Sequence, residues 1–184
     1  MPLTGNTLPF GLRDVKLTPI KTDGTLDTAN KVDLPAARTF SFTDAEDFET
    51  LEGDDSTAAS HGKGPLVEWD LEGGGLSLDV WKVLSGGTIT QTGTTPAQKA
   101  TYTKLVTDSR PYFQVEGQAI SDSGGDVHCI VYRCKADGNL EGSFENGSFM
   151  LTAASGHGFG DTVGLTPTNK LYDFVRNEAV TAIV

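Results

Sequence analysis

The chain has 184 residues, a mass of 19.5 kDa and 37% hydrophobic residues, so we expect one globular domain spanning residues 1–184. Its formal net charge of −11 excludes general electrostatic binding of nucleic acid or of an anionic membrane, since both need clustered positive charge. No apolar stretch is long enough to span a membrane, and the opening MPLTGNTLPFG lacks the basic and apolar parts of a secretory signal. Gly and Thr are abundant, which favours strands and turns over helices.

The first part of the chain predicts an arm followed by two strands. Residues 1–9 contain prolines and a glycine that block regular structure, so we expect an N-terminal arm there. A short alternation of apolar and polar residues predicts a strand at 10–20. A second strand is predicted at 32–42, where Pro35 places its start at an edge or a bulge.

An acidic segment, residues 43–64, follows the second predicted strand. Its candidate functional residues are Asp44, Glu46, Asp47, Phe48, Glu49, Leu51, Glu52, Asp54 and Asp55. Like charges at this density repel one another, which predicts an extended and exposed segment. Three interpretations stay open: a solvated loop, a docking loop that uses Phe48 and Leu51, and a Ca²⁺ site. The segment lacks the pattern of a calcium-binding loop, in which alternating ligands are followed by a closing bidentate Glu.

Residues 66–72 carry the clearest alternation in the chain and predict a third strand. Strand side chains point to opposite faces in turn, so one face of this strand is apolar and the other carries carboxylates. The apolar set is Val67, Trp69 and Leu71, and the acidic set is Glu68, Asp70 and Glu72. We therefore expect one buried face and one face with three carboxylates in a row.

A single short helix is predicted at about 77–85. Ser77 lies at the N-cap position, Asp79 lies in the first turn, and apolar residues follow at helical spacing. Gly86 and Gly87 mark its end.

The rest of the chain returns to strand patterns separated by turn clusters. The predicted strands are 88–92, 100–107, 112–121, 127–135 and 140–152. Short strands at this spacing predict a mainly β fold, a sandwich or a barrel. Residues 153–184 are predicted to form a C-terminal arm or extension, with a strand or an arm at 171–184.

The motifs that could support catalysis are weak. Asp122-Ser-Gly-Gly125 is similar to the nucleophile turn of chymotrypsin-like proteases, and His61 and Asp108 precede Ser123 in that family's order. The flanking residues and the spacing depart from the family pattern, and this tetrapeptide is also an ordinary hairpin turn.

Cys129 and Cys134 lie on one predicted strand, too far apart to form a disulfide, so we expect free core thiols. The histidines are scattered and no paired C-x-x-C exists, so we expect no zinc site.

Three stretches of the chain resemble the major tail proteins, or tail tube subunits, of siphophages that infect actinobacteria. These stretches are 51–56 (LEGDDS), 64–72 (GPLVEWDLE) and 117–129 (GQAISDSGGDVHC), and the resemblance extends over about residues 10–152. It implies a β-sandwich with one helix that forms hexameric rings, which stack into the hollow tail that delivers phage DNA to the host. It also implies that each subunit gives four strands to an inner barrel and that the terminal arms lock onto neighbours.

The resemblance also implies roles for particular residues and partners. The long loop between the second and third strands reaches an adjoining ring in this family, so segment 43–64 is expected to be the inter-ring loop. Glu68, Asp70 and Glu72 are expected to face the lumen, where carboxylates repel DNA.

The implied partners are further copies of the chain, a tape measure protein, and tail terminator or tail tip proteins. DNA would pass without specific binding, and no membrane partner, cofactor or catalysis is implied. The implied location is the virion, after assembly in the host cytoplasm.

The alternative from another class is a monomeric β-sandwich that binds a ligand, such as a carbohydrate-binding module. Tyr102, Tyr112 and Tyr132 could supply an aromatic platform, although they are more simply core or interface residues. The two readings predict different behaviour, because a binding module stays monomeric whereas a tube subunit forms rings or tubes as its concentration rises.

Overall fold

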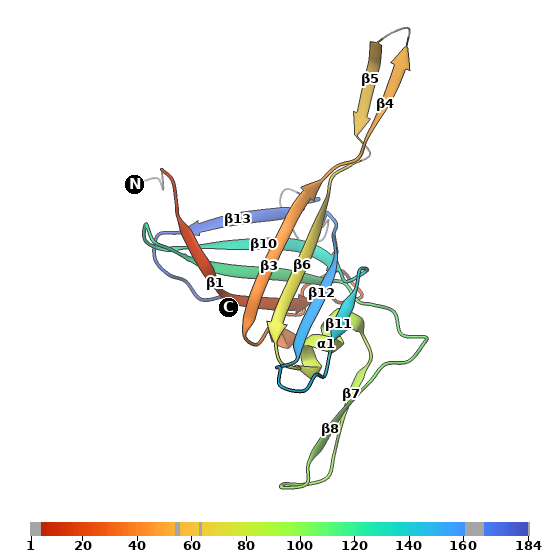
Figure 1. The fold of residues 1–184 in the computed structure, drawn as a ribbon, viewed down its shortest axis with the longest axis vertical. Coiled ribbons are helices and arrows are strands. Elements are labelled where there is room, and N and C mark those ends of the chain that lie inside the picture. The colour runs from red at the N-terminus through yellow and green to blue at the C-terminus, as the bar shows by residue number, and fades with distance from the viewer. Residues whose placement is uncertain (1–4, 54–55, 63, 161–167, 184) are drawn as a thin grey trace.

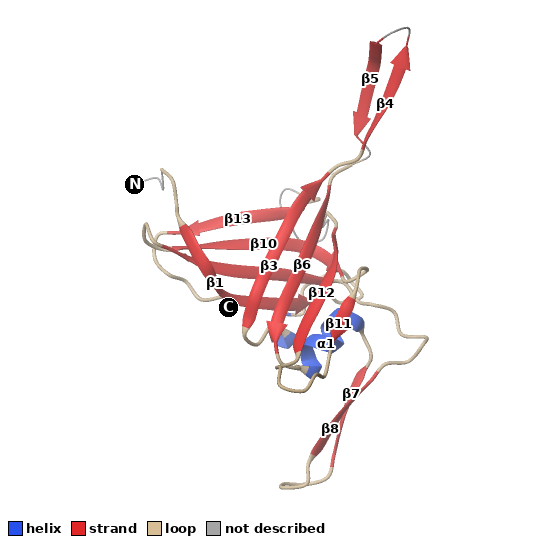
Figure 2. Ribbon diagram, in the orientation of Figure 1, coloured by secondary structure: helices blue, strands red, loops and turns tan. Residues whose placement is uncertain are grey.

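Strands dominate the structure, as the sequence predicts. The computed structural model describes all residues except 1–4, 54–55, 63, 161–167 and 184. One α-helix, α1, and one 3₁₀ helix accompany the strands, and Figure 2 shows how little of the described chain is helical. The strands are β1 (Pro9–Pro19), β2 (Val32–Asp33), β3 (Ala37–Ala45), β4 (Phe48–Gly53), β5 (Ser56–Gly62), β6 (Leu66–Gly74), β7 (Thr88–Thr92), β8 (Lys99–Thr103), β9 (Phe113–Ser121), β10 (Asp126–Lys135), β11 (Leu140–Gly142), β12 (Leu151–Gly158) and β13 (Tyr172–Asn177), and the helices are α1 (Leu78–Ser85) and the 3₁₀ helix (Thr28–Asn30).

Nine of the strands form one antiparallel sheet that folds into two layers (Figure 1). The first layer has the order β3-β6-β12-β11, and the second has the order β2-β1-β9-β10-β13. The layers join at a corner, where Cys134 of β10 pairs with Gly158 of β12. The remaining four strands form two separate hairpins, β4–β5 and β7–β8.

The core lies between the two layers. The apolar face of β6 is buried as predicted, with Val67, Trp69 and Leu71 at most 3% exposed. Trp69 meets Phe113 of β9 edge to face, with ring centroids 5.6 Å apart. Burying a large apolar side chain stabilises a fold by about 2 kcal/mol, so this alternation fixes which face of the first layer remains in solvent.

The predicted helix is confirmed with its cap. α1 begins after Ser77, whose hydroxyl accepts a hydrogen bond from the Val80 N–H, and it ends at Gly86, which has a φ of +82°. Val83 and Leu84 bury its apolar side beside the second layer.

Several predicted boundaries are wrong. The strand predicted at 32–42 is two strands, since Pro35 and the positive φ of Ala36 break it between β2 and β3. The strand predicted at 140–152 is β11 and the start of β12, separated by an irregular loop at 143–150. The described residues of the segment predicted at 43–64 are extended and largely exposed, as expected, but most of them pair as the β4–β5 hairpin instead of forming an open loop.

The prediction of a C-terminal arm or extension at 153–184 is wrong where β12 forms, but the strand considered within 171–184 is present as β13. β12 is an inner strand of the first layer because its glycines fit beneath large side chains: a Cβ on Gly156 would lie 2.0 Å from the Lys135 carbonyl oxygen and 2.8 Å from Trp69. β13 pairs along β10, and its Phe174 packs on Phe42 with ring centroids 5.5 Å apart. Of the N-terminal arm predicted at 1–9, residues 5–8 are irregular and Pro9 begins β1.

Candidate functional site

The carboxylates predicted at 66–72 form a line along the outer face of the first layer. Glu68 and Asp70 are exposed and Glu72 is half-buried. Their neighbours on β3 are Thr43, Ser41 and Thr39, and those on β12 are His157, Ser155 and Ala153. Alternate residues of a strand lie about 7 Å apart, so three negative charges follow one another on a surface that is otherwise small and polar.

Little positive charge offsets this line, which we call the carboxylate face (Glu68, Asp70, Glu72 and the adjoining Glu141). The Arg38 guanidinium lies 3.4 Å from Glu72 and is more than half exposed. His157, the other basic side chain nearby, is turned to Asp137, 2.8 Å away. Within the described part of the chain, neither Glu68 nor Asp70 has an ion-pair partner.

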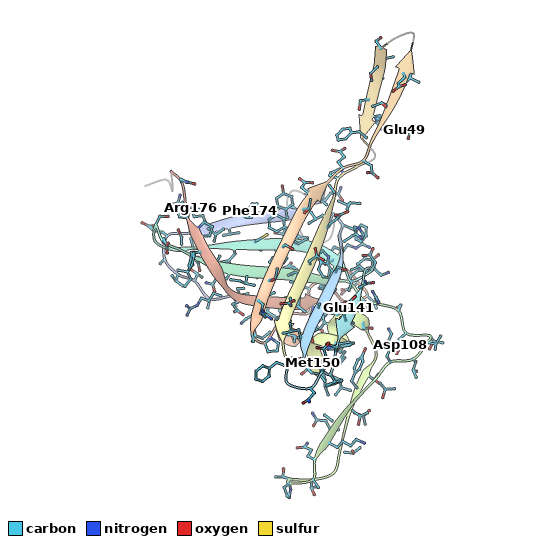
Figure 3. The ribbon with its side chains drawn as sticks, in the orientation of Figure 1. Glu49, Asp108, Glu141, Met150, Phe174 and Arg176 are labelled. Atoms are coloured by element: carbon cyan, nitrogen blue, oxygen red, sulfur yellow. The ribbon has the colours of Figure 1, made fainter. Side chains whose placement is uncertain are left out.

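Sequence reasoning missed Glu141, the fourth member of this face. It lies on β11 and pairs with Ala153, which itself pairs with Glu72 across β12. The registers therefore place Glu141, labelled in Figure 3, in one row with Glu72, beside a groove of about 340 Å³ that Asp70 also lines. The sequence pattern predicts one continuous strand at 140–152. It gives no indication of the turn at 143–150, which makes β11 a separate strand beside β12.

Both edges of the first layer are open. Among the described strands β3 pairs only with β6, and β11 pairs only with β12. An edge strand presents unpaired N–H and C=O groups that another chain can join. The second layer has open edges at β2 and β13.

The acidic segment is a hairpin that projects beyond the two-layered body (Figure 1). It extends β3 and β6 from the end where Ala45 pairs with Leu66, and its strands pair only with each other. Phe48 and Leu51 are 63% and 65% exposed, so neither supports the core of its own chain. Glu46, Asp47, Glu49 and Glu52 belong to the same projection, and Asp54 and Asp55 lie outside the described residues.

Asp44 differs from the other acidic candidates. It is in β3 and accepts a hydrogen bond from the Tyr172 hydroxyl at 3.2 Å, which raises the pKa of Tyr172. This residue therefore belongs to the body rather than to the hairpin. No group of His, Cys, Asp or Glu in the described ranges is arranged to hold a metal ion, so the calcium interpretation gains no support.

A second cluster, also missed from the sequence, holds the C-terminal segment 178–183 on the outer face of the second layer. Asp126 is fully buried and accepts hydrogen bonds from the Thr181 N–H, Gln118 and Asn177. Burial alone would raise the pKa of Asp126, but these hydrogen bonds and that of His128 lower it to about 2. Lys16 donates to the Ile183 carbonyl at 2.9 Å and completes the attachment.

The residues considered for catalysis do not assemble. Ser123 Oγ is 2.8 Å from Ser121 Oγ and accepts from the Leu8 N–H, Asp108 accepts from the Leu105 N–H, and His61 lies on the projecting β5. Hydrogen bonds between any two of these three are absent from the described residues.

The two cysteines are free and buried, as predicted. Burial raises the pKa of Cys129 to about 12, so this thiol is not nucleophilic near neutrality.

The three tyrosines of the ligand-binding alternative do not form a platform. The Tyr102 hydroxyl donates to the Gly86 carbonyl at 2.7 Å, and the buried Tyr132 donates to Asp173 at 2.8 Å. Tyr112 is half-buried and lies under the Arg133 guanidinium. Each ring is occupied within its own chain, on a different element.

Comparison with known proteins adds no relative to these observations. A scan against protein-family models finds no match, and a search of curated proteins finds no significant match. None of the helices in the described residues is long and apolar enough to cross a membrane.

Proposed function

We propose that this chain is a structural virion protein, the tail tube subunit of a long non-contractile phage tail. In this proposal it assembles into hexameric rings that stack into the hollow tube through which phage DNA reaches the host. The observation that carries the proposal is one four-stranded layer, β3-β6-β12-β11, that combines a carboxylate outer face with two open edges.

The directions of the edge strands suit a closed barrel. Neighbouring strands of the layer are antiparallel throughout, so β3 and β11 run in opposite directions. When copies stand side by side with the same end up, β3 of one copy meets β11 of the next in an antiparallel sense. A ring built this way joins the layers of all copies into one barrel and removes their edges.

The carboxylate face becomes the wall of the tube in this arrangement. Duplex DNA carries one negative charge per about 1.7 Å, and a protein holds it by neutralising phosphates with Lys and Arg. A wall of Glu68, Asp70, Glu72 and Glu141 does the reverse, because it repels the phosphates and keeps DNA from adhering during transit. Among the described residues neither Glu68 nor Asp70 has an ion-pair partner, which supports that role.

The projecting hairpin is the inter-ring element of the proposal. A separate hairpin with exposed Phe48 and Leu51 is of little use to an isolated subunit, whereas an adjoining ring would cover both side chains. By resemblance to tail tubes, the remaining partners are a tape measure protein at the lumen and terminator or tip proteins at the ends. Assembly would take place in the host cytoplasm.

Electron microscopy of the purified protein across a concentration series tests the proposal. We expect rings or hollow tubes, with the bore lined by the β3-β6-β12-β11 layer. Tail tube subunits can wait as monomers for an initiator, so the series should be repeated with preformed tail tips or short tube fragments of the same phage as seeds. Particles that stay monomeric at every concentration, with and without seeds, would contradict the proposal.

A further inference from the structure

Two hairpins project from opposite ends of the body. β4–β5 extends the first layer beyond Ala45 and Leu66, while β7–β8 follows α1 at the end where β6 terminates at Gly74 (Figure 1). Each pairs only with itself, and an isolated two-stranded hairpin is at best marginally stable in water. Both hairpins would therefore be stabilised by packing against another surface.

The two projections carry opposite charge. The described residues from 46 to 62 hold four carboxylates and no Lys or Arg. Segment 86–107, which contains β7 and β8, holds Lys99 and Lys104 and no Asp or Glu; Asp108 follows it directly, and Glu145 lies in the neighbouring 143–150 loop. Lys104 is tied to its own chain through the Asp108 carbonyl at 2.9 Å, but Lys99 is exposed, as is Lys82 in the last turn of α1.

Each end also exposes large apolar side chains. Phe48 and Leu51 lie on the acidic hairpin. At the other end Leu105 is 58% exposed and Val106 is fully exposed, just after β8. The 143–150 loop adds Phe144 and Phe149, at 86% and 95% exposed, and it lies at this end because Leu151 pairs with Gly74. Figure 3 shows Glu49 at one end of the molecule and Met150 and Asp108 toward the other.

We infer that the acidic hairpin of one copy docks on the opposite end of a second copy, against the basic segment 86–107 and the 143–150 loop. This inference rests on the proposed function, to which it adds the receiving surface. The carboxylates meet Lys99 and Lys82, and Phe48 and Leu51 cover the exposed apolar side chains near Val106. The two contact surfaces differ, so the contact repeats without closing and generates a stack.

Disulfide cross-linking between two variants that each carry one introduced cysteine tests this contact directly. Leu51→Cys and Val106→Cys are mixed under mild oxidation; the native thiols are buried and give little background. We expect a heterodimer at a yield at least tenfold above that of Leu51→Cys mixed with Ser123→Cys, which is exposed on the β9–β10 turn. Equal yields in the two mixtures would overturn the inference.

Charge reversal provides a second test of the same contact. Asp47→Lys with Glu52→Lys, and separately Lys82→Glu with Lys99→Glu, should each abolish stacking of rings, and all four changes in one chain should restore it. Glu178→Lys with Lys21→Glu, both exposed elsewhere, is the control pair. Tubes that form normally in both single-end variants would overturn the docking but leave the tube function standing. A wild-type chain that never assembles would remove the tube function itself and the docking with it.

Discussion

The imidazole of His128 donates to the carboxylate of Glu116 across 2.8 Å, from Nδ1 to Oε1. Its other ring nitrogen, Nε2, lies 2.9 Å from the Thr181 carbonyl oxygen, which can only accept. A neutral imidazole has one N–H, so these two contacts together require the charged imidazolium. The ring is thus a buried cation between Glu116 and Asp126 that binds the C-terminal segment.

This arrangement predicts a loss of stability at alkaline pH. Burial alone would lower the pKa of His128, but the hydrogen bonds and charges of Glu116 and Asp126 raise it above 6.5. The folded pKa exceeds the unfolded one, so the stabilisation is complete below pH 6.5 and is lost as pH rises through the folded pKa. Urea unfolding at a series of pH values should show this decrease in the wild type and not in His128→Gln. Equal slopes in the two proteins would contradict the charged state.

The lowered pKa of Asp126 predicts a loss of stability at acidic pH. Its pKa falls from 3.8 to about 2 on folding, so its contribution is present above pH 3.8 and is lost as pH falls through about 2. Asp126→Asn should lower the free energy of unfolding at neutral pH by about 3 kcal/mol, because a buried donor replaces an acceptor and His128 loses a counter-charge. Asp122→Asn, at an exposed turn, is the matched control. A neutral-pH effect no larger than that of the control would exclude the buried cluster as a source of stability.

Gly156 should not tolerate a side chain. A Cβ there would lie 2.0 Å from the Lys135 carbonyl oxygen, which is backbone and cannot move away cheaply. We expect Gly156→Ala to destabilise the fold by about 3 kcal/mol, measured by thermal or urea unfolding. Gly53→Ala is the control, since its nearest neighbour would be Ala58 at 3.7 Å, an ordinary contact. Similar losses in both variants would argue against the close approach of β12 to the corner.

Reversing the carboxylate face should make assembled tubes retain DNA. The triple variant Glu68→Lys, Asp70→Lys and Glu72→Lys replaces repulsion by attraction, so tubes should bind duplex DNA with an affinity that falls steeply with salt. DNA retention by pelleted tubes, at low and moderate salt, is the measurement. A second triple variant, Asp23→Lys, Asp122→Lys and Glu178→Lys, makes the same charge change at exposed turns and a terminus. If both variants bind equally, these three carboxylates do not line the bore.

Removing the acidic hairpin should leave a folded subunit that cannot stack. Ala45 and Leu66 are already paired, so an Asn-Gly turn in place of residues 46–65 would join β3 to β6 directly. The melting temperature should change little, because every described residue of β4 and β5 except Gly62 is exposed. Electron microscopy should then show single rings at most. Tubes of normal length would contradict an inter-ring role.

Local signals account for the parts of the fold that the sequence predicts. The alternation at 66–72 needs only one buried face, and the cap at Ser77 with Gly86 at the end defines α1 to within a residue. β7 also lies at its predicted bounds. The three carboxylates of β6 were likewise placed correctly on the solvent side, because their direction depends on strand geometry alone.

The parts that escaped prediction depend on contacts between distant residues. The glycines of β12 resemble a loop until Trp69 and the corner at Lys135 occupy the space that side chains would fill. Charge repulsion in the acidic segment suggests an open loop, but two strands can pair while their side chains point into water. The attachment of Thr181 to Asp126 joins residues 55 apart, with no pattern at either site.

Hairpins that pair only with themselves also affect how fast an assembly could begin. In a free subunit they gain little from their own packing, so the encounter of two free copies must order four strands at once, and that entropy opposes the first contact. At the end of a stack of the proposed kind, an added copy contacts its neighbours in the ring as well as the ring beneath, and these additional contacts offset the entropy of ordering. Growth from a seed would then outpace spontaneous nucleation, and concentrated subunits would persist until a template arrives.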